Sequence, residues 1–316
     1  MSATLAEYID YEPHTPDQII QSAIAEGHDR FYGMYSGGQD STCTTHFVAE
    51  NYPDNFVGVI HADTGVSLEA TRKFVIEYCK EMEWPLFFTK PPKRKRNTEQ
   101  HGTEFTYEAF VMQYGFPHAK SHPWMMAYLK KFGWENFMHN PRKKEPGATL
   151  ISGVRKSESV ARMKLKAYTQ MEIHEDNQCV YVPPFLYKTG YQVSRYFFEH
   201  GLKKSPAYDM GFGISGECMC GAFADPWERE LIRQNDPPLY ARIVKLEKDV
   251  KAHGSEYASH HVEWGKSVPY VGPALAKIKK KPEQSTLFEE IDPVTQASMC
   301  GESCGLKLEV KEDDSG

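Results

Sequence analysis

Residues 36–42, Ser36-Gly37-Gly38-Gln39-Asp40-Ser41-Thr42, are the part of the sequence best suited to chemistry on a phosphate. They follow a short aromatic run and precede a helical pattern, which predicts a tight turn between a strand and a helix. Glycines in such a turn expose backbone N–H groups to an anion, and the hydroxyl groups add further donors. The partial positive charge of the helix N-terminus favours the same ligand. The segment is therefore predicted to bind phosphate, although it matches neither the Walker nor the dinucleotide-binding glycine pattern.

The elements that must position this loop alternate between strands and helices. Because the alternation indicates a parallel sheet with right-handed crossovers, we expect an α/β, Rossmann-type fold with helices flanking the sheet and ligands beyond the carboxyl ends of the strands. Buried strands are predicted over 30–35, 56–62, 84–89 and 148–152, and helices over 15–27, 42–51 and 67–81.

Composition places limits on the class of protein. The chain has 316 residues, 40% of them hydrophobic, which is enough to bury a full core. Its net charge of −6 excludes a global basic field, so any contact with nucleic acid has to be local. No basic and apolar leader begins the sequence and no run of 18 apolar residues occurs, so we expect a cytoplasmic protein that does not enter the membrane. Its oligomeric state is left open.

Two close pairs of cysteines stand apart from the other three. A thiolate pair can bind zinc or hold an iron–sulfur cluster, and two pairs together would supply four ligands. Neither spacing is the common form with two intervening residues, so free thiols are the alternative. The pairs are Cys218 with Cys220 and Cys300 with Cys304; the others are Cys43, Cys79 and Cys179.

Four ordered motifs carry a family resemblance. The sequence resembles the phosphoadenylylsulfate (PAPS) reductase family of the adenine nucleotide α-hydrolase-like superfamily, whose members share a pyrophosphatase loop. The resemblance covers residues 28–225. Its motifs are the loop at 36–42; His61-Ala62-Asp63-Thr64-Gly65 with Glu69-Ala70-Thr71; Gly153-Val154-Arg155 with Glu158-Ser159 and Arg162; and Pro183-Pro184-Phe185 through Val193, Tyr208 and Gly216-Glu217-Cys218-Met219-Cys220.

The resemblance implies ATP, with Mg²⁺, or an adenylylsulfate-type nucleotide as the ligand, and it implies a set of site residues. Asp40 would stabilise the loop or help to place the magnesium ion, and two arginines would contact an anionic group. The implied catalytic residues are Asp40, Arg155 and Arg162, and the implied nucleotide-binding residues are Ser36, Gly37, Gly38, Asp40, Ser41, Thr42, Asp63, Gly65, Gly153 and Arg155.

The family resemblance also bears on the cysteines. Adenylylsulfate reductases have two cysteine pairs in a similar layout that bind a [4Fe–4S] cluster, which implies Cys218, Cys220, Cys300 and Cys304 as ligands of a cluster or of Zn²⁺. The segment Ser303-Cys304-Gly305-Leu306-Lys307 is also similar to the tail that carries the nucleophilic cysteine of the reductases. Cys304 cannot serve as ligand and as free nucleophile at the same time.

Three functions follow as hypotheses. The unaltered loop favours an ATP pyrophosphatase that adenylates an acceptor and passes sulfur to it, in the manner of nucleic-acid thiolation or DNA phosphorothioation enzymes. The cysteine tail favours a PAPS or adenylylsulfate reductase. The third is a noncatalytic nucleotide-binding module. The first two imply a sulfur or electron donor protein as partner, and the basic run at 90–96 is a local candidate for contact with nucleic acid, or else a solvated loop.

The sequence also predicts four divisions of the chain. They are a helical N-terminal segment at 1–27, a nucleotide-binding domain at 28–225, a helical C-terminal extension with the second cysteine pair at 226–309, and a disordered acidic tail at 310–316. The aromatic and apolar residues between 124 and 137 are expected to be core that roofs the pocket.

Overall fold

A computed structural model describes residues 14–90, 106–138, 148–158, 174–176 and 179–266. The strands are β1 (Arg30–Met34), β2 (Phe56–Ala62), β3 (Leu86–Thr89), β4 (Ala148–Ile151), β5 (His174–Asp176) and β6 (Cys179–Val182). The α-helices are α2 (Pro16–Ala25), α3 (Gln39–Asn51), α4 (Glu69–Glu81), α5 (Tyr107–Tyr114), α6 (His122–Met126), α7 (Phe132–Met138), α9 (Gly190–Glu199), α10 (Glu228–Asn235) and α11 (Pro237–His253). Shorter turns of helix are η1 (Ala127–Lys131), η2 (Lys156–Glu158) and η4 (Ala258–His260).

The six described strands form one sheet in the order β3-β2-β1-β4-β6-β5. Every neighbouring pair is parallel except β5 and β6, which run antiparallel. The chain moves outward from β1 to β3 and then returns to place β4 on the other side of β1. This reversal leaves a crevice at the carboxyl ends of β1 and β4, the position where open α/β sheets bind their ligands.

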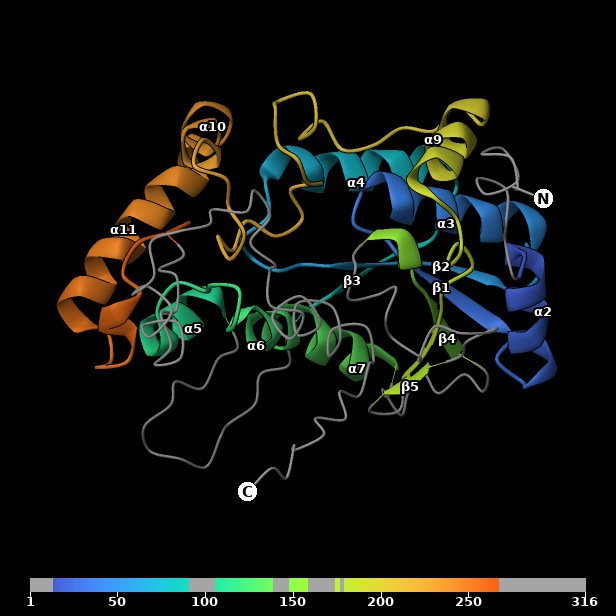
Figure 1. Cartoon of the computed structure of the whole chain (residues 1–316), viewed down its shortest axis with the longest axis horizontal. Helices are drawn as coiled ribbons and strands as arrows, with labels where there is room; N and C mark the ends of the chain where they lie inside the picture. The colour runs from blue at the N-terminus through green and yellow to red at the C-terminus, as the bar shows by residue number, and fades with distance from the viewer. Residues whose placement is uncertain (1–13, 91–105, 139–147, 159–173, 177–178, 267–316) are drawn as a thin grey trace, which may run out of the picture.

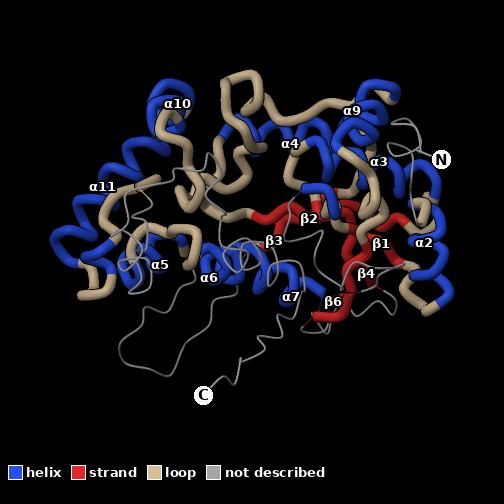
Figure 2. The backbone as a smooth tube through the Cα atoms, viewed as in Figure 1, coloured by secondary structure: helices blue, strands red, loops and turns tan. Residues whose placement is uncertain are grey.

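Helices cover both faces of this sheet (Figure 1). Side chains alternate along β1, so that Phe31 packs in one core with α2, α3 and α9, and Tyr32 packs in another with Trp134 of α7. Figure 2 shows the strands between α3, α4 and α9 on one side and α6 and α7 on the other. Burial on both faces explains why the strand sequences are almost continuously apolar.

The predicted fold class, a parallel sheet flanked by helices, is confirmed. All four predicted strands are present, while β5 and β6 were not predicted from the sequence. Helix α3 begins three residues earlier than expected, at Gln39, because Gly38 has the extended conformation of an N-cap, with a φ of −83°.

A second body of helices lies at the β3 end of the sheet, where α11 packs against both α10 and α5 (Figure 1). Their apolar residues share one core with the loop that carries Cys220 and with Trp264. In the described part of the chain no helix is both long and apolar enough to cross a membrane.

Candidate functional site

The turn between β1 and α3 is held by hydrogen bonds among its own residues. The hydroxyl groups of Ser36 and Ser41 lie 3.0 Å apart, and the Ser41 hydroxyl also donates to the carbonyl of Gly38 at 2.9 Å. Gly37 has a φ of +77°, which favours glycine. The Thr42 hydroxyl donates to the same Gly38 carbonyl at 2.8 Å. These bonds fix a tight loop at the N-terminus of a 13-residue helix, as a phosphate-binding turn requires.

The segment after β4 packs directly against this loop. A Cβ atom at Gly153 would lie 3.0 Å from the backbone nitrogen of Ser41 and 3.2 Å from the carbonyl carbon of Asp40. Only glycine allows the two backbones to approach this closely without displacing one of them. The predicted loops after β1 and β4 therefore meet at the sheet reversal.

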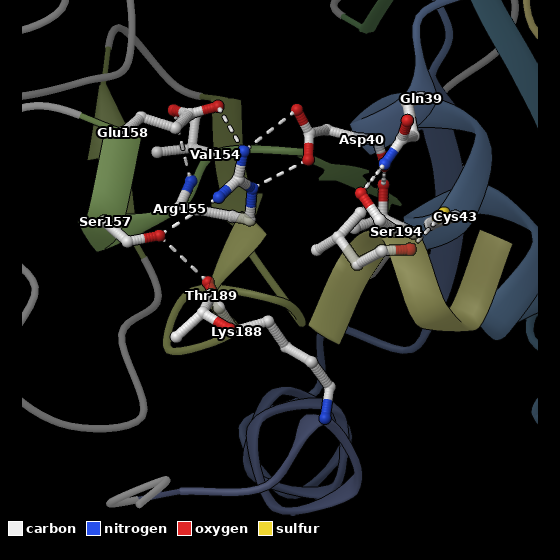
Figure 3. A network of polar contacts seen from close by, with 12 residues as sticks. Gln39, Asp40, Cys43, Val154, Arg155, Ser157, Glu158, Lys188, Thr189 and Ser194 are labelled. Atoms are coloured by element: carbon white, nitrogen blue, oxygen red, sulfur yellow. Dashed lines mark hydrogen bonds and ion pairs between the residues drawn. The ribbon is translucent and has the colours of Figure 1, made fainter. Parts of the chain in front are cut away.

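Asp40 and Arg155 form a bidentate ion pair between these two loops (Figure 3). The guanidinium Nε and Nη2 atoms donate to the two carboxylate oxygens at 2.7 and 3.3 Å. Nη1 donates to the Ser157 hydroxyl at 3.0 Å, and Glu158 lies 3.9 Å from Nη2. Arg155 is thus paired with Asp40 in this structure, and its predicted contact with an anion stays a prediction.

A cleft of about 430 Å³ opens beside the phosphate loop. It is lined by residues of the phosphate loop, by the segment after β4, by one lysine, and by side chains of the helices on the opposite face of the sheet. Its lining comprises Met34, Tyr35, Ser36, Gly38, Gln39, Asp40, Ser41, Ile60, Met126, Lys130, Trp134, Ser152, Gly153, Val154, Glu158, Tyr208, Gly213, Ile214, Ser215 and Glu217.

Lys130 is a cleft residue that the sequence reasoning missed. Its ammonium group forms a short ion pair with the carboxylate of Glu217, and the two side chains are only 18% and 9% exposed. Burial lowers the pKa of Lys130, but Glu217 and the nearby cysteines outweigh it and raise the pKa above its ordinary value. The signal in the sequence was a cation within an apolar helical pattern. Lys130 reaches the cleft from the π-helical turn η1, which the pattern does not reveal.

Five of the predicted nucleotide-binding residues are not among the described residues that line the cleft: Gly37, Thr42, Asp63, Gly65 and Arg155. Asp63 follows β2 and pairs with Lys90, whose Nζ atom is 3.1 Å from the carboxylate. The carbonyl of Gly65 accepts a hydrogen bond from Arg242 at 2.9 Å. Arg162 lies outside the described residues.

Four described cysteines are free, and they fall into two environments. Burial raises the pKa of Cys43 and of Cys79 to about 12. Cys218 and Cys220 are hydrogen-bonded to each other, and this bond raises the pKa of the donor, Cys218, and lowers that of the acceptor, Cys220.

The proposed metal site cannot be assembled from the described residues alone. Within the described ranges, no group of three or more His, Cys, Asp or Glu side chains could hold a metal ion. Cys218 and Cys220 can contribute two thiolates, and Cys300 and Cys304 lie outside those ranges. The four-cysteine site therefore stays a prediction.

The site and the fold agree with a family relationship detected in the sequence. A family model of the phosphoadenosine phosphosulfate reductase domain matches residues 31–222. The chain belongs to this family, as the ordered motifs predicted.

Solved structures similar to this chain include two from yeasts. PAPS reductase from Candida auris, in a phosphate complex, has 17% identity and a TM-score of 0.44, over 68% of this chain and 96% of its own. FMN adenylyltransferase from Candida glabrata, in complex with FMN and the ATP analog AMPCPP, has 14% identity and a TM-score of 0.37, over 67% and 68% of the two chains. No curated protein matches the sequence.

Proposed function

We propose that this chain cleaves ATP between its α- and β-phosphates, adenylates an acceptor, and takes part in the transfer of sulfur to that acceptor. The observation that carries the proposal is the unaltered loop from Ser36 to Thr42, positioned at the sheet reversal with an open cleft of about 430 Å³ beside it. Such a loop suits a nucleoside triphosphate that releases pyrophosphate. The loop and the N-terminus of α3 together offer several backbone N–H groups that can donate to the oxygens of the pyrophosphate.

The chain's own groups would act mainly by binding charge. The loop N–H groups would hold the departing pyrophosphate, and Lys130 would oppose the charge that develops on it. An oxygen of the acceptor attacks the α-phosphorus, the bond to the bridging oxygen breaks, and pyrophosphate leaves with the electron pair. The acceptor is then joined to AMP and can be attacked by sulfur.

Magnesium fits this cleft by the chemistry of its carboxylates. Asp40 and Glu158 both line it, and Mg²⁺ in nucleotide sites is commonly held by one or two carboxylates together with phosphate oxygens. When bound, the ion would neutralise phosphate charge during cleavage.

The reductase alternative rests on one observation, the tail segment Cys304-Gly305-Leu306. In that case the cysteine thiol would attack the sulfur of a bound adenylylsulfate-type nucleotide, and ATP would not be cleaved. This tail lies outside the described residues, so the choice between the two reactions depends on a measurement.

The test is release of pyrophosphate and AMP from ATP by the full chain, purified without oxygen and analysed for iron, zinc and acid-labile sulfide. We expect pyrophosphate release that Asp40→Ala abolishes, while Asp54→Ala, which changes an exposed aspartate in a turn after α3, retains it. A protein inert toward ATP that releases sulfite from adenylylsulfate in the presence of a thiol would overturn the proposal in favour of the reductase.

A further inference from the structure

The first two turns of α4 pack against the phosphate loop. A Cβ atom at Gly37 would lie 3.4 Å from a methyl group of Val75 and 3.5 Å from the ring of Phe74. Thr71 precedes Val75 by four residues, so the two side chains share one face of the helix. Thr71 is 0% exposed. It is therefore a buried polar side chain on the face of α4 that contacts the loop.

The hydroxyl group of Thr71 joins two segments that are far from α4 in the sequence. It donates to the carbonyl of Ser215 at 2.7 Å, and its oxygen lies 2.9 Å from the hydroxyl oxygen of Ser205. A hydroxyl group carries one hydrogen, so Ser205 has to be the donor in the second bond. Ser205 is also 0% exposed. The bond between Thr71 and Ser205 therefore lies in the protein interior and has a defined direction.

Ser205 connects Thr71 to the phosphate loop. Its backbone N–H donates to the carbonyl of Gly37 at 2.8 Å. The C=O and N–H groups of a planar trans peptide point in opposite directions, so anchoring the Gly37 carbonyl also fixes the direction of the Gly38 N–H. Gly38 lines the nucleotide cleft. Thr71 thus acts, through Ser205, on the peptide unit between the two glycines of the loop.

The other partner of Thr71 belongs to a second segment of the cleft lining. Ser215 lines the cleft, and a Cβ atom at Gly38 would lie 3.6 Å from the Cβ atom of Ser215. The carbonyl of the adjacent Gly216 accepts a hydrogen bond from the N–H of Leu68 at 2.9 Å. A Cβ atom at Gly216 would lie 2.7 Å from the hydroxyl oxygen of Thr71. The start of α4 therefore holds this segment at close contact.

We propose that Thr71 is a positioning residue for ATP cleavage, whose hydroxyl group sets the orientation of the Gly37–Gly38 peptide relative to the cleft segment at Ser215. The proposal rests on the proposed function. Thr71 is not among the described residues that line the cleft, so its effect is transmitted by Ser205 and Ser215. Two observations carry it: one hydroxyl group is bonded to both segments, and it is fully buried. Groups that lose a partner in the interior cannot turn to solvent for a replacement.

Thr71→Val keeps the size of the side chain and removes its hydroxyl group. The Ser215 carbonyl and the Ser205 hydroxyl then each lose a buried partner, and the two segments can shift relative to each other. Because a displacement of about 1 Å can cost roughly 100-fold in rate, pyrophosphate release from ATP by the full chain should fall about 10-fold to 100-fold. Thr71→Ser keeps the hydroxyl group and should release pyrophosphate at a rate close to that of the parent protein.

Thr45→Val is the matched control. It makes the same change in a side chain of 1% exposure on α3, the helix that begins at the phosphate loop. Within the described residues the Thr45 hydroxyl has no hydrogen-bond partner, so its removal breaks no bond. The rate of Thr45→Val should therefore match that of the parent protein. If it falls as far as the rate of Thr71→Val, the effect comes from any change of a buried threonine near the loop, and the positioning role is wrong.

Binding of inorganic pyrophosphate with Mg²⁺, measured by calorimetric titration, separates positioning from a loss of folded protein. Unfolded chains lower the number of sites per chain and leave the dissociation constant of the remaining sites unchanged. We expect Thr71→Val to keep the number of sites and to bind pyrophosphate about tenfold more weakly, the loss typical of one hydrogen bond to a charged group. Fewer sites with an unchanged dissociation constant would assign Thr71 to stability alone and overturn the proposal.

A double-mutant cycle tests whether Thr71 acts through Ser205. Ser205→Ala keeps the backbone N–H that donates to Gly37 and removes the hydroxyl that donates to Thr71, so it should lower the rate by less than Thr71→Val does. The double variant should lose little more than Thr71→Val alone, because both changes remove the same bond. Losses that multiply would show that the two residues act independently, which contradicts the connection to the phosphate loop.

Failure of the proposed function is distinguishable from failure of the positioning role. A parent chain that binds pyrophosphate but does not cleave ATP contradicts adenylation alone, and the dissociation constants of the variants still decide the role of Thr71. A parent chain that cleaves ATP no faster than Thr71→Val contradicts positioning alone. A parent chain that neither cleaves ATP nor binds pyrophosphate overturns both.

Discussion

The phosphate loop and the loop that carries Cys218 and Cys220 are held in place in different ways. The phosphate loop at 36–42 is held largely by bonds between residues at most five positions apart, as between Ser36 and Ser41. The cysteine loop, which carries Cys218 and Cys220, is held by Tyr107, 113 positions from Cys220, and by Val66, which is still farther along the chain from Met219. The phosphate loop therefore combines local bonds with a few long-range contacts, such as the pair between Asp40 and Arg155, whereas the cysteine loop depends on packing between the sheet, α5 and the C-terminal helices. The predictions below test this difference.

Lys130→Met should have the largest effect on stability. It leaves the carboxylate of Glu217 buried without its main partner, which typically costs roughly 3 kcal/mol of unfolding free energy. Urea unfolding of the parent and the variant measures the loss. The double variant Lys130→Met with Glu217→Gln should recover most of it. An unchanged unfolding midpoint in the single variant would show that the ion pair does not stabilise the folded protein.

Gly153→Ala should damage the nucleotide cleft with little effect on the cysteine loop. The new methyl group would lie 3.0 Å from the backbone nitrogen of Ser41 and would displace the loop. Misplaced catalytic groups cost about 100-fold in rate, so pyrophosphate release should fall by about that factor. Gly213→Ala is the control, because Gly213 lines the same cleft and a Cβ atom added there would meet no other atom within 4 Å. Equal rates in the two variants would contradict the tight packing at Gly153.

Acid should destabilise the folded protein through His122. Burial, together with the charge of Lys130, lowers the pKa of His122 from 6.5 to about 4. Because the folded-state pKa is the lower one, the unfolded chain binds the proton first, and stability falls as the pH drops from 6.5 toward 4. The loss attributable to this residue between pH 7 and pH 5 is about 2 kcal/mol.

Urea unfolding at both pH values measures that loss. His122→Gln should reduce the difference between pH 7 and pH 5 by the same amount, since glutamine does not titrate. A variant with the same pH dependence as the parent protein would place the acid sensitivity elsewhere.

Lys90→Ala should have the smallest effect. Lys90 is 71% exposed, and its pair with Asp63 is therefore screened by solvent. Exposed ion pairs contribute at most about 1 kcal/mol, so the change in unfolding free energy should stay within about 0.5 kcal/mol. A larger loss by urea unfolding would indicate that Lys90 fixes Asp63 beside the cleft.

The alternation of strands and helices could be predicted from the sequence, because each buried strand is a short apolar run and each helix has its own periodicity. The turn at 36–42 could also be predicted, because its glycines and hydroxyl groups interact with residues only a few positions away in the sequence. The small strand β5 and the π-helical turn at 127–131 could not be predicted, because no local pattern distinguishes the strand from a loop or the π-helical turn from an α-helix.

The sequence by itself determined the α/β fold, the family and the residues of the phosphate loop, all of which depend on short-range order along the chain. Only the tertiary structure decided that Arg155 pairs with Asp40, 115 positions away. It also decided that Lys130 and Glu217 form an ion pair in the lining of the cleft. These arrangements depend on how segments that are distant in the sequence pack against each other, and such packing produces no periodic pattern of residues that could be recognised in the sequence.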